Sequence, residues 1–157
     1  MIELENRIKQ LESIVMRSDR VGRVINVYPN KGTVRVEIDD IDNVKSYELP
    51  IIFQKTGNDK FYCMPDIHEH VLVKFLPNGL EQGFVIGSFY SSEDKPPVTD
   101  PDKYHVKFSD GSFMEYDRKS HELEINIKGK ITINATDEIS IHSDTHHVTT
   151  APKIDHN

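Results

Sequence analysis

The chain has 157 residues, of which 36% are hydrophobic and 29% are charged, and its formal net charge is −7. This length is enough for one ordinary domain or for a small domain with an extension. The modest apolar content predicts an elongated shape or a core shared between chains. The negative charge argues against general binding to nucleic acid phosphates or anionic membranes, because both call for a basic protein face.

A single cysteine, Cys63, rules out a disulfide within the chain. Its neighbours are Tyr62 and Met64, and we expect a buried structural thiol rather than a nucleophile. No apolar run approaches membrane-spanning length, and the N-terminus lacks the apolar region of a secretory signal. We therefore expect a protein without a signal peptide.

Residues 2–16 have the pattern of an amphipathic helix, and we assign residues 1–18 to an N-terminal helical segment. Leu4, Ile8, Leu11 and Val15 recur at spacings of 4, 3 and 4, which places them on one stripe. A helix this short needs support from tertiary contacts. Two interpretations stay open: the stripe packs on its own domain, or it forms a coiled-coil-like seam against other chains.

From residue 20 the pattern changes to short strands separated by turns. Pro50 limits the hydrogen bonding of the third strand, and the loop after it is longer than a usual hairpin loop. The expected strands lie in residues 20–29, 33–39, 46–53, 70–77 and 82–90. Five short strands with a break after the third predict a small closed or half-closed barrel, such as an OB-fold, over residues 19–90.

Residues 91–102 are expected to be an extended linker, because they carry charges and a Pro-Pro pair. A hairpin that turns at Asp110 and Gly111 follows, and three strand-like stretches then run to residue 143. The large apolar residues of these stretches all fall on odd positions: Leu123, Ile125, Ile127, Ile131, Ile133, Ile139 and Ile141.

Full burial of these seven side chains would contribute roughly 10–20 kcal/mol. A lone meander cannot bury them, because its other face is polar and it has no second layer. The barrel has its own core, and the helix is far away in sequence. Three chains that wind around one axis would bury the odd positions together and remove the open sheet edges. We therefore expect residues 103–157 to form an intertwined trimeric β-helix, a β-prism, with these seven residues as its core.

Residues 64–97, with the segments "GFVIGSFY" and "PP", and the alternating tail resemble the central spike, or baseplate assembly protein V, of contractile phage tails and phage-tail-like bacteriocins. The resemblance covers the chain from about Val21 onward. It implies an OB-fold that leads into a trimeric β-helix and serves as the membrane-piercing tip below the tail tube. We expect neither the hub domains of the larger type VI secretion spikes nor the lysozyme domain of some phage spikes.

The resemblance also implies the partners and the location. The expected partners are two further copies of the chain, the baseplate hub, the tail tube proteins and, on contraction, the target cell envelope. The protein would be made in the host cytoplasm and reside in the baseplate of a virion or of a phage-tail-like particle.

The sequence carries no catalytic motif, so we expect a protein that is not an enzyme. Residues 39–43 depart from a calcium-binding loop, and there is neither a nucleophile elbow nor a Gly-rich phosphate loop. The alternative function is an OB-fold module for single-stranded nucleic acid or oligosaccharide, with no nucleic acid partner expected under the leading hypothesis. Such a module would bind through aromatic residues, for which the candidates are Tyr28, Tyr47, Phe53, Phe61 and Tyr62.

Four of the eight histidines lie in the last sixteen residues. The simplest interpretation is an exposed polar tail, but on a threefold axis two histidines per chain would supply six ligands, which suits octahedral iron. Members of the family often bind iron at the tip through a His-x-His pair, whereas here His146 and His147 are adjacent. Only His147 keeps the odd phase of the isoleucines, and His156 lies at the expected apex. These two are the candidate metal ligands, while His68 and His70 are expected at the surface or in packing.

Overall fold

The computed structural model describes residues 1–40, 44–77 and 82–152. Its contacts divide the chain into two units, Met1–Pro96 and Pro97–Asn157, and the division falls inside the segment expected to be a linker. Within the described residues, no helix is long and apolar enough to cross a membrane.

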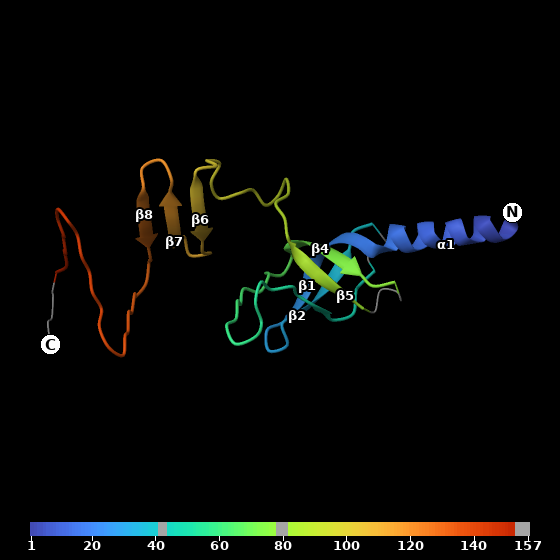
Figure 1. Cartoon of the computed structure of the whole chain (residues 1–157), viewed down its shortest axis with the longest axis horizontal. Helices are drawn as coiled ribbons and strands as arrows, with labels where there is room; N and C mark the ends of the chain where they lie inside the picture. Colours follow the sequence, from blue (N-terminus) through green and yellow to red (C-terminus); the bar gives the residue numbers. More distant parts are fainter. Residues whose placement is uncertain (41–43, 78–81, 153–157) are drawn as a thin grey trace. The chain divides into compact units, whose positions relative to one another are not determined.

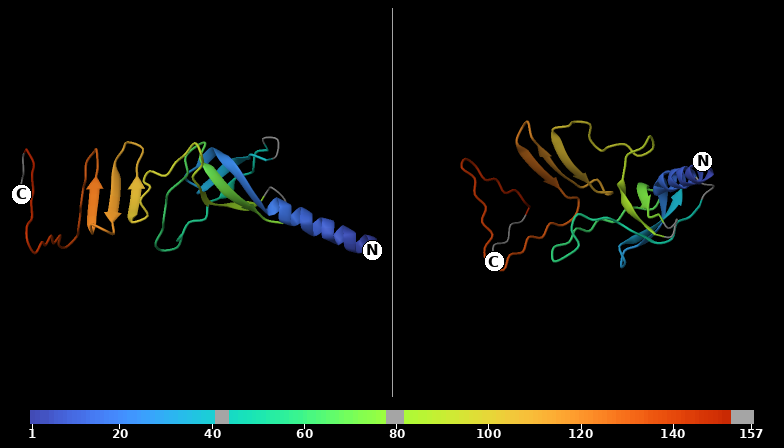
Figure 2. Two further views of the ribbon diagram at one scale, coloured as in Figure 1. Left: turned by 90° about the horizontal axis from the view of Figure 1, so that it is seen from above. Right: turned by 45° about the vertical axis from the view of Figure 1, so that its right-hand side comes forward.

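The first unit contains helix α1 (Ile2–Ser18) and strands β1 (Asp19–Tyr28), β2 (Thr33–Ile38), β3 (Leu49–Pro50), β4 (His70–Phe75) and β5 (Gly83–Ser88). The strands form one antiparallel sheet in the order β3-β2-β1-β4-β5, and Figure 1 labels β1, β2, β4 and β5. Ile51 forms a parallel bridge with Val85, and the N–H of Ile52 donates to the Val85 carbonyl at 2.9 Å. This contact joins the two edges of the sheet, so that it nearly closes into the expected barrel (Figure 2).

The barrel interior is filled by alternating strand residues, mostly β-branched, which suit a pleated and half-buried surface. All three inward positions of β2, for example, are fully buried. The buried apolar set is Val24, Val34, Val36, Ile38, Leu49, Val71, Val73, Phe75 and Val85. The first unit therefore has a core of its own.

The strand expected in residues 46–53 is only two residues long in the structure. The Ser46 hydroxyl accepts a hydrogen bond from the Val36 N–H at 2.9 Å and donates one to the Tyr47 carbonyl at 2.7 Å. Pro50 has no N–H to donate. A side chain thus takes over part of the ladder in this segment, and the regular pairing shrinks to Leu49 and Pro50.

One further expectation about the first unit is wrong, and the structure narrows one choice that the sequence left open. Cys63 is exposed rather than buried, because it lies in a loop outside the barrel core, next to the exposed side chains of Phe61 and Tyr62. The apolar stripe of α1 does not pack on its own domain at Leu4, Ile8 and Leu11, which are 63%, 46% and 61% exposed.

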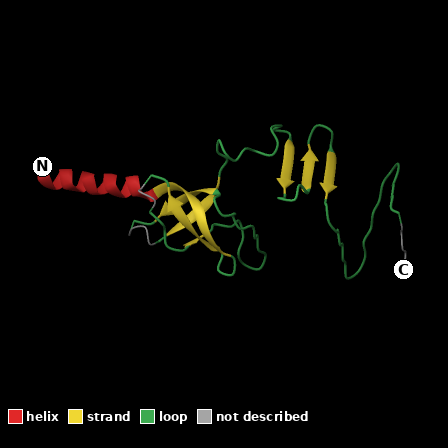
Figure 3. Ribbon diagram, turned by 180° about the vertical axis from the view of Figure 1, so that it is seen from behind, coloured by secondary structure: helices red, strands yellow, loops and turns green. Residues whose placement is uncertain are grey.

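The second unit is a three-stranded antiparallel meander of β6 (Lys103–Lys107), β7 (Phe113–Asp117) and β8 (Glu122–Asn126) (Figure 3). The hairpin predicted at Asp110 and Gly111 is confirmed, and Gly111 takes a φ of 85° that favours glycine. Residues 127–152 form no strand within the single chain. The two strand-like stretches expected beyond β8 have no ladder partner in the same chain, so an intertwined β-helix is not part of this structure.

Truncation of a core residue should destabilise the barrel selectively. We expect Leu49→Ala to lower the free energy of unfolding by about 2–5 kcal/mol, because Leu49 is fully buried and the change leaves a cavity. Leu72→Ala, on the exposed face of β4, is the matched control and should cost clearly less. Denaturant unfolding of the full chain measures both, and equal losses would contradict the assigned barrel interior.

Candidate functional site

The sheet of the second unit has one face made of large apolar side chains. The register aligns Tyr104 with Tyr116 and Tyr116 with Leu123 in one row across β6, β7 and β8. Val106, Met114 and Ile125 form the next row. These six residues, here called the apolar face, are between 39% and 74% exposed in the single chain. A contiguous exposed patch of this kind marks an interaction surface.

The opposite face of the same sheet is mainly polar, and the carboxylate of Glu115 at its centre is paired. Glu115 accepts hydrogen bonds from the Lys103 ammonium at 2.6 Å and lies 2.7 Å from Nδ1 of His105. The His105 ring stacks on Phe113 with centroids 5.5 Å apart. The hydrogen bonds from Lys103 and His105 lower the pKa of Glu115, and Glu115 raises the pKa of Lys103. The polar groups of this face therefore need no second layer of protein to provide hydrogen-bond partners.

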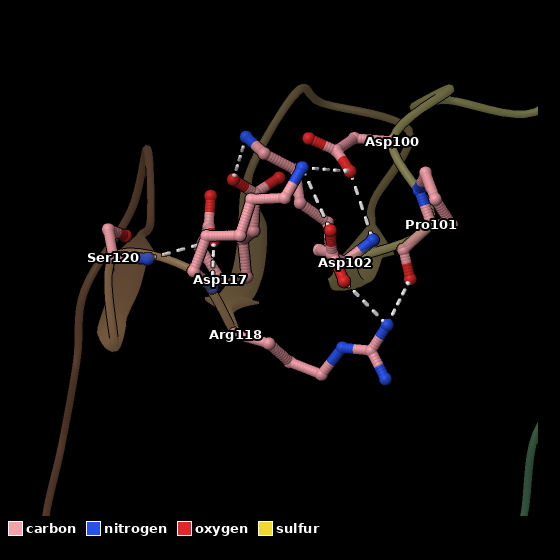
Figure 4. A network of polar contacts seen from close by, with 9 residues as sticks. Asp100, Pro101, Asp102, Asp117, Arg118 and Ser120 are labelled. Carbon is pink, nitrogen blue, oxygen red and sulfur yellow. Dashed lines mark hydrogen bonds and ion pairs between the residues drawn. The ribbon is translucent and has the colours of Figure 1, made fainter.

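A second polar network holds the start of β6 to the turn after β7 (Figure 4). Asp102 accepts a hydrogen bond from Arg118 at 2.7 Å and pairs with Lys119 at 2.9 Å. These two cations lower the pKa of Asp102, Lys119 having the larger effect. Asp117 accepts the Lys119 N–H at 2.7 Å, which shapes the turn itself. Side chains of the second unit thus hold the start of β6 against the turn after β7.

Hydrogen bonds between nearby residues also hold the turn between β6 and β7. Asp110 accepts hydrogen bonds from the N–H of Ser112 at 2.8 Å and from its hydroxyl at 3.0 Å, and both lower the pKa of Asp110. The Ser112 hydroxyl in turn accepts the Lys128 N–H at 3.0 Å, which ties this turn to the chain leaving β8. Hydrogen bonds and ion pairs within the meander thus hold its polar face, the contact between the start of β6 and the turn after β7, and the β6–β7 turn. No other described part of the unit covers the apolar face.

The structure brings only part of the predicted trimer core together. Leu123 and Ile125 lie on the apolar face, and Ile127 follows them half-buried. The remaining predicted core residues, Ile131, Ile133, Ile139 and Ile141, are exposed in a segment without strands. The sequence analysis missed the four other members of the apolar face, which are Tyr104, Val106, Met114 and Tyr116. The alternation in "YHVKF" and "FMEY" was the signal that could have found them.

The candidate metal ligands are not assembled within one chain. His147 is exposed, and its Nε2 lies 3.1 Å from the Thr149 hydroxyl, while His156 lies outside the described residues. A turn in which Ser143 exchanges hydrogen bonds with His146 separates His147 from Ile141. Over residues 1–40, 44–77 and 82–152, no three metal-ligating side chains gather at one point.

The first unit has a cavity of about 500 Å³ beside the start of β4 and the end of β5. Its lining carries the carboxylates of Asp66, Glu69 and Asp94. His70 is buried next to it, with its Nδ1 3.7 Å from Asp94 and its ring 5.9 Å from Phe89. His68 is exposed, so the assignment of these two histidines to surface and packing is confirmed.

The aromatic residues of the barrel do not form a basic binding groove. Phe53 and Tyr62 stack with centroids 6.4 Å apart, and Lys31 lies over the Tyr28 ring at 5.4 Å. Lys31 is paired with Glu48 at 3.0 Å, and Lys55 is paired with Asp59. Cations that are already paired offer little to a phosphate backbone.

Residues 20–90 match the family of the type VI secretion system/phage-baseplate injector OB domain. The chain thus carries an OB domain of the phage-baseplate injector type, which supports the phage-baseplate spike family. It is also similar to a spike protein of Escherichia phage P2, with 24% identity over 119 residues. That match covers 76% of this chain and 55% of the relative, so the chain spans about half of the relative's length. The matched OB domain coincides with the barrel, and the apolar face lies outside it.

The polar face should make the second unit sensitive to acid. Because the pKa of Glu115 is lowered in the folded state, its contribution is present above the ordinary glutamate range and is lost as the pH falls through the lowered value. We expect Glu115→Gln to reduce this acid-induced loss of thermal stability, measured by melting at pH 3 to 7, roughly the range over which glutamates titrate. Glu124→Gln, which lies opposite Glu115 on the same face, is the control. The same pH profile for wild type and Glu115→Gln would contradict the assigned role.

Proposed function

We propose that this protein is the structural central spike of a contractile tail or injection particle. The family supports a role in the baseplate. The observation that carries the proposal is the apolar face, six large exposed side chains on a sheet that is otherwise satisfied, continued along the chain by exposed isoleucines. An exposed apolar face on a sheet whose opposite face and turns are held by polar contacts is what we expect when other chains supply the second layer.

In this proposal three identical chains bury their apolar faces and isoleucines around one axis, as an intertwined β-helix. The core is Leu123, Ile125, Ile127, Ile131, Ile133, Ile139 and Ile141, joined by the four apolar residues of β6 and β7. Closure around an axis removes the open sheet edges and the exposed apolar surface at once. The tail would then resist unfolding, because every chain is held by two others.

The function of such a trimer is mechanical. The barrel attaches the spike to the baseplate hub and the tail tube, and contraction drives the tail of the spike into the target envelope. The protein acts without catalysis as part of a virion or of a phage-tail-like particle. Binding of single-stranded nucleic acid or oligosaccharide is not favoured, since the barrel cations near the aromatic residues are paired with carboxylates.

We also propose that the tip binds an iron ion through His147 and His156 of three chains. Imidazole nitrogens suit iron, and the exposed His147 ring contacts Thr149, which could orient it as an outer partner does. One chain brings no three ligands together among the described residues. The fit therefore depends on trimer formation, and the ion would cross-link the three ends.

The oligomeric state tests the proposed function. The full chain should have a mass in solution of three times 18.1 kDa, and Ile133→Asp should prevent trimer formation, because three carboxylates would meet in an apolar interior. Thr132→Asp adds the same charge at the neighbouring position of opposite phase and should leave the trimer intact. Light scattering measures the three masses. A wild-type monomer would overturn the spike proposal, and a trimeric Ile133→Asp variant would overturn the assigned phase.

Metal analysis of the purified trimer tests the tip site. We expect close to one iron per three chains, and loss of this iron in His147→Ala and in His156→Ala. His142→Ala is the control, because His142 falls on the opposite phase and contacts Asp144 at 3.0 Å. Unchanged iron content in both ligand variants would remove the assignment.

A further inference from the structure

Helix α1 carries an apolar stripe whose residues Leu4, Ile8 and Leu11 are left exposed by their own chain. Leu4, Ile8 and Leu11 are each roughly half exposed or more, although the barrel has a closed core of its own a short distance along the chain. A helix of 17 residues is only marginally stable by itself. The stripe therefore needs a partner outside the unit.

The spacing of the stripe gives each residue of α1 a position in a heptad. Leu4 and Leu11 take the d position and Ile8 takes the a position, which together form the seam of a coiled coil. Arg7 then falls at position g, and Glu12 falls at position e of the following heptad. In parallel helices that are in register, a g residue of one helix faces the e residue five positions later on its neighbour.

The charges at these two positions are opposite and free to pair between chains. Arg7 and Glu12 are exposed, and neither belongs to any ion pair within 4.0 Å that the described residues form. Residues five apart on one helix do not face each other, since the facing pairs are three and four apart. Arg7 and Glu12 thus complement each other only between two helices.

We propose that α1 of three copies of this chain packs as a parallel coiled coil in register, with Arg7 of each copy paired to Glu12 of the next. The occupant of the apolar stripe is a further copy of the same helix. The inference rests on the proposed trimer, which supplies three helices of the same direction. Ile at a with Leu at d by itself favours two strands, so the number three is set by the tail and not by α1. The aliphatic stem of Arg7 covers the seam while its guanidinium reaches Glu12.

Disulfide trapping in the full chain tests the packing. In a Cys63→Ser background, Leu11→Cys places one thiol at the seam, and Ser13→Cys places one on the outer side of the same turn. Mild oxidation should link two of the three chains of each Leu11→Cys trimer and leave Ser13→Cys unlinked on a non-reducing gel. A trimer in which Leu11→Cys links no better than Ser13→Cys overturns the inference about α1 and leaves the spike proposal standing. A wild-type monomer overturns the spike proposal itself.

Charge reversal tests the pair. In the Leu11→Cys background at low salt, Arg7→Glu should reduce the linked fraction, because like charges then face each other at every helix contact. Adding Glu12→Arg to this variant should restore the linked fraction, which loss of helix stability alone would not do. Equal linking in all three proteins, or no recovery in the double reversal, would overturn the pairing of Arg7 with Glu12.

Discussion

The structure depends on one constraint, which is that the apolar face of the β6–β8 sheet cannot be covered by its own unit. Its two rows of side chains are exposed, while Glu115, Asp102 and Asp110 satisfy the opposite face, the corner and the turn. A sheet with one polar face and one exposed apolar face is stable when a second layer buries the apolar face. The proposed assembly of the second unit with other chains rests on this imbalance.

The first unit contrasts with this arrangement. Its described residues include nine buried apolar side chains, and the bridge between Ile51 and Val85 nearly closes the barrel. In the same unit, Leu4, Ile8 and Leu11 of α1 remain exposed. The chain thus combines a self-sufficient domain, which carries the family match, with two segments whose apolar surfaces are uncovered. This combination is consistent with the proposed spike, which attaches through its barrel and assembles through its ends.

The sequence alone led to much of the fold. Period-two alternation gave the five barrel strands, and the Asp-Gly turn gave the β6–β7 hairpin, because both patterns are local. The third barrel strand was predicted too long, since the hydrogen bond from Val36 to the Ser46 side chain leaves no mark in the hydrophobic pattern. Cys63 was misplaced, because whether a loop residue finds room in a core depends on residues that fill it from elsewhere.

What the sequence by itself determined is the type of the helix, of the barrel strands and of the β6–β7 hairpin, together with the apolar stripe of α1 and the odd spacing of the isoleucines. What only the tertiary structure decided is which side chains share a face. Strand pairing placed Tyr104, Tyr116 and Leu123 in one row, although the two tyrosines have even numbers and Leu123 has an odd number. The turns between strands set that register, and register joins residues that are distant in sequence, so periodicity within one strand cannot reveal it.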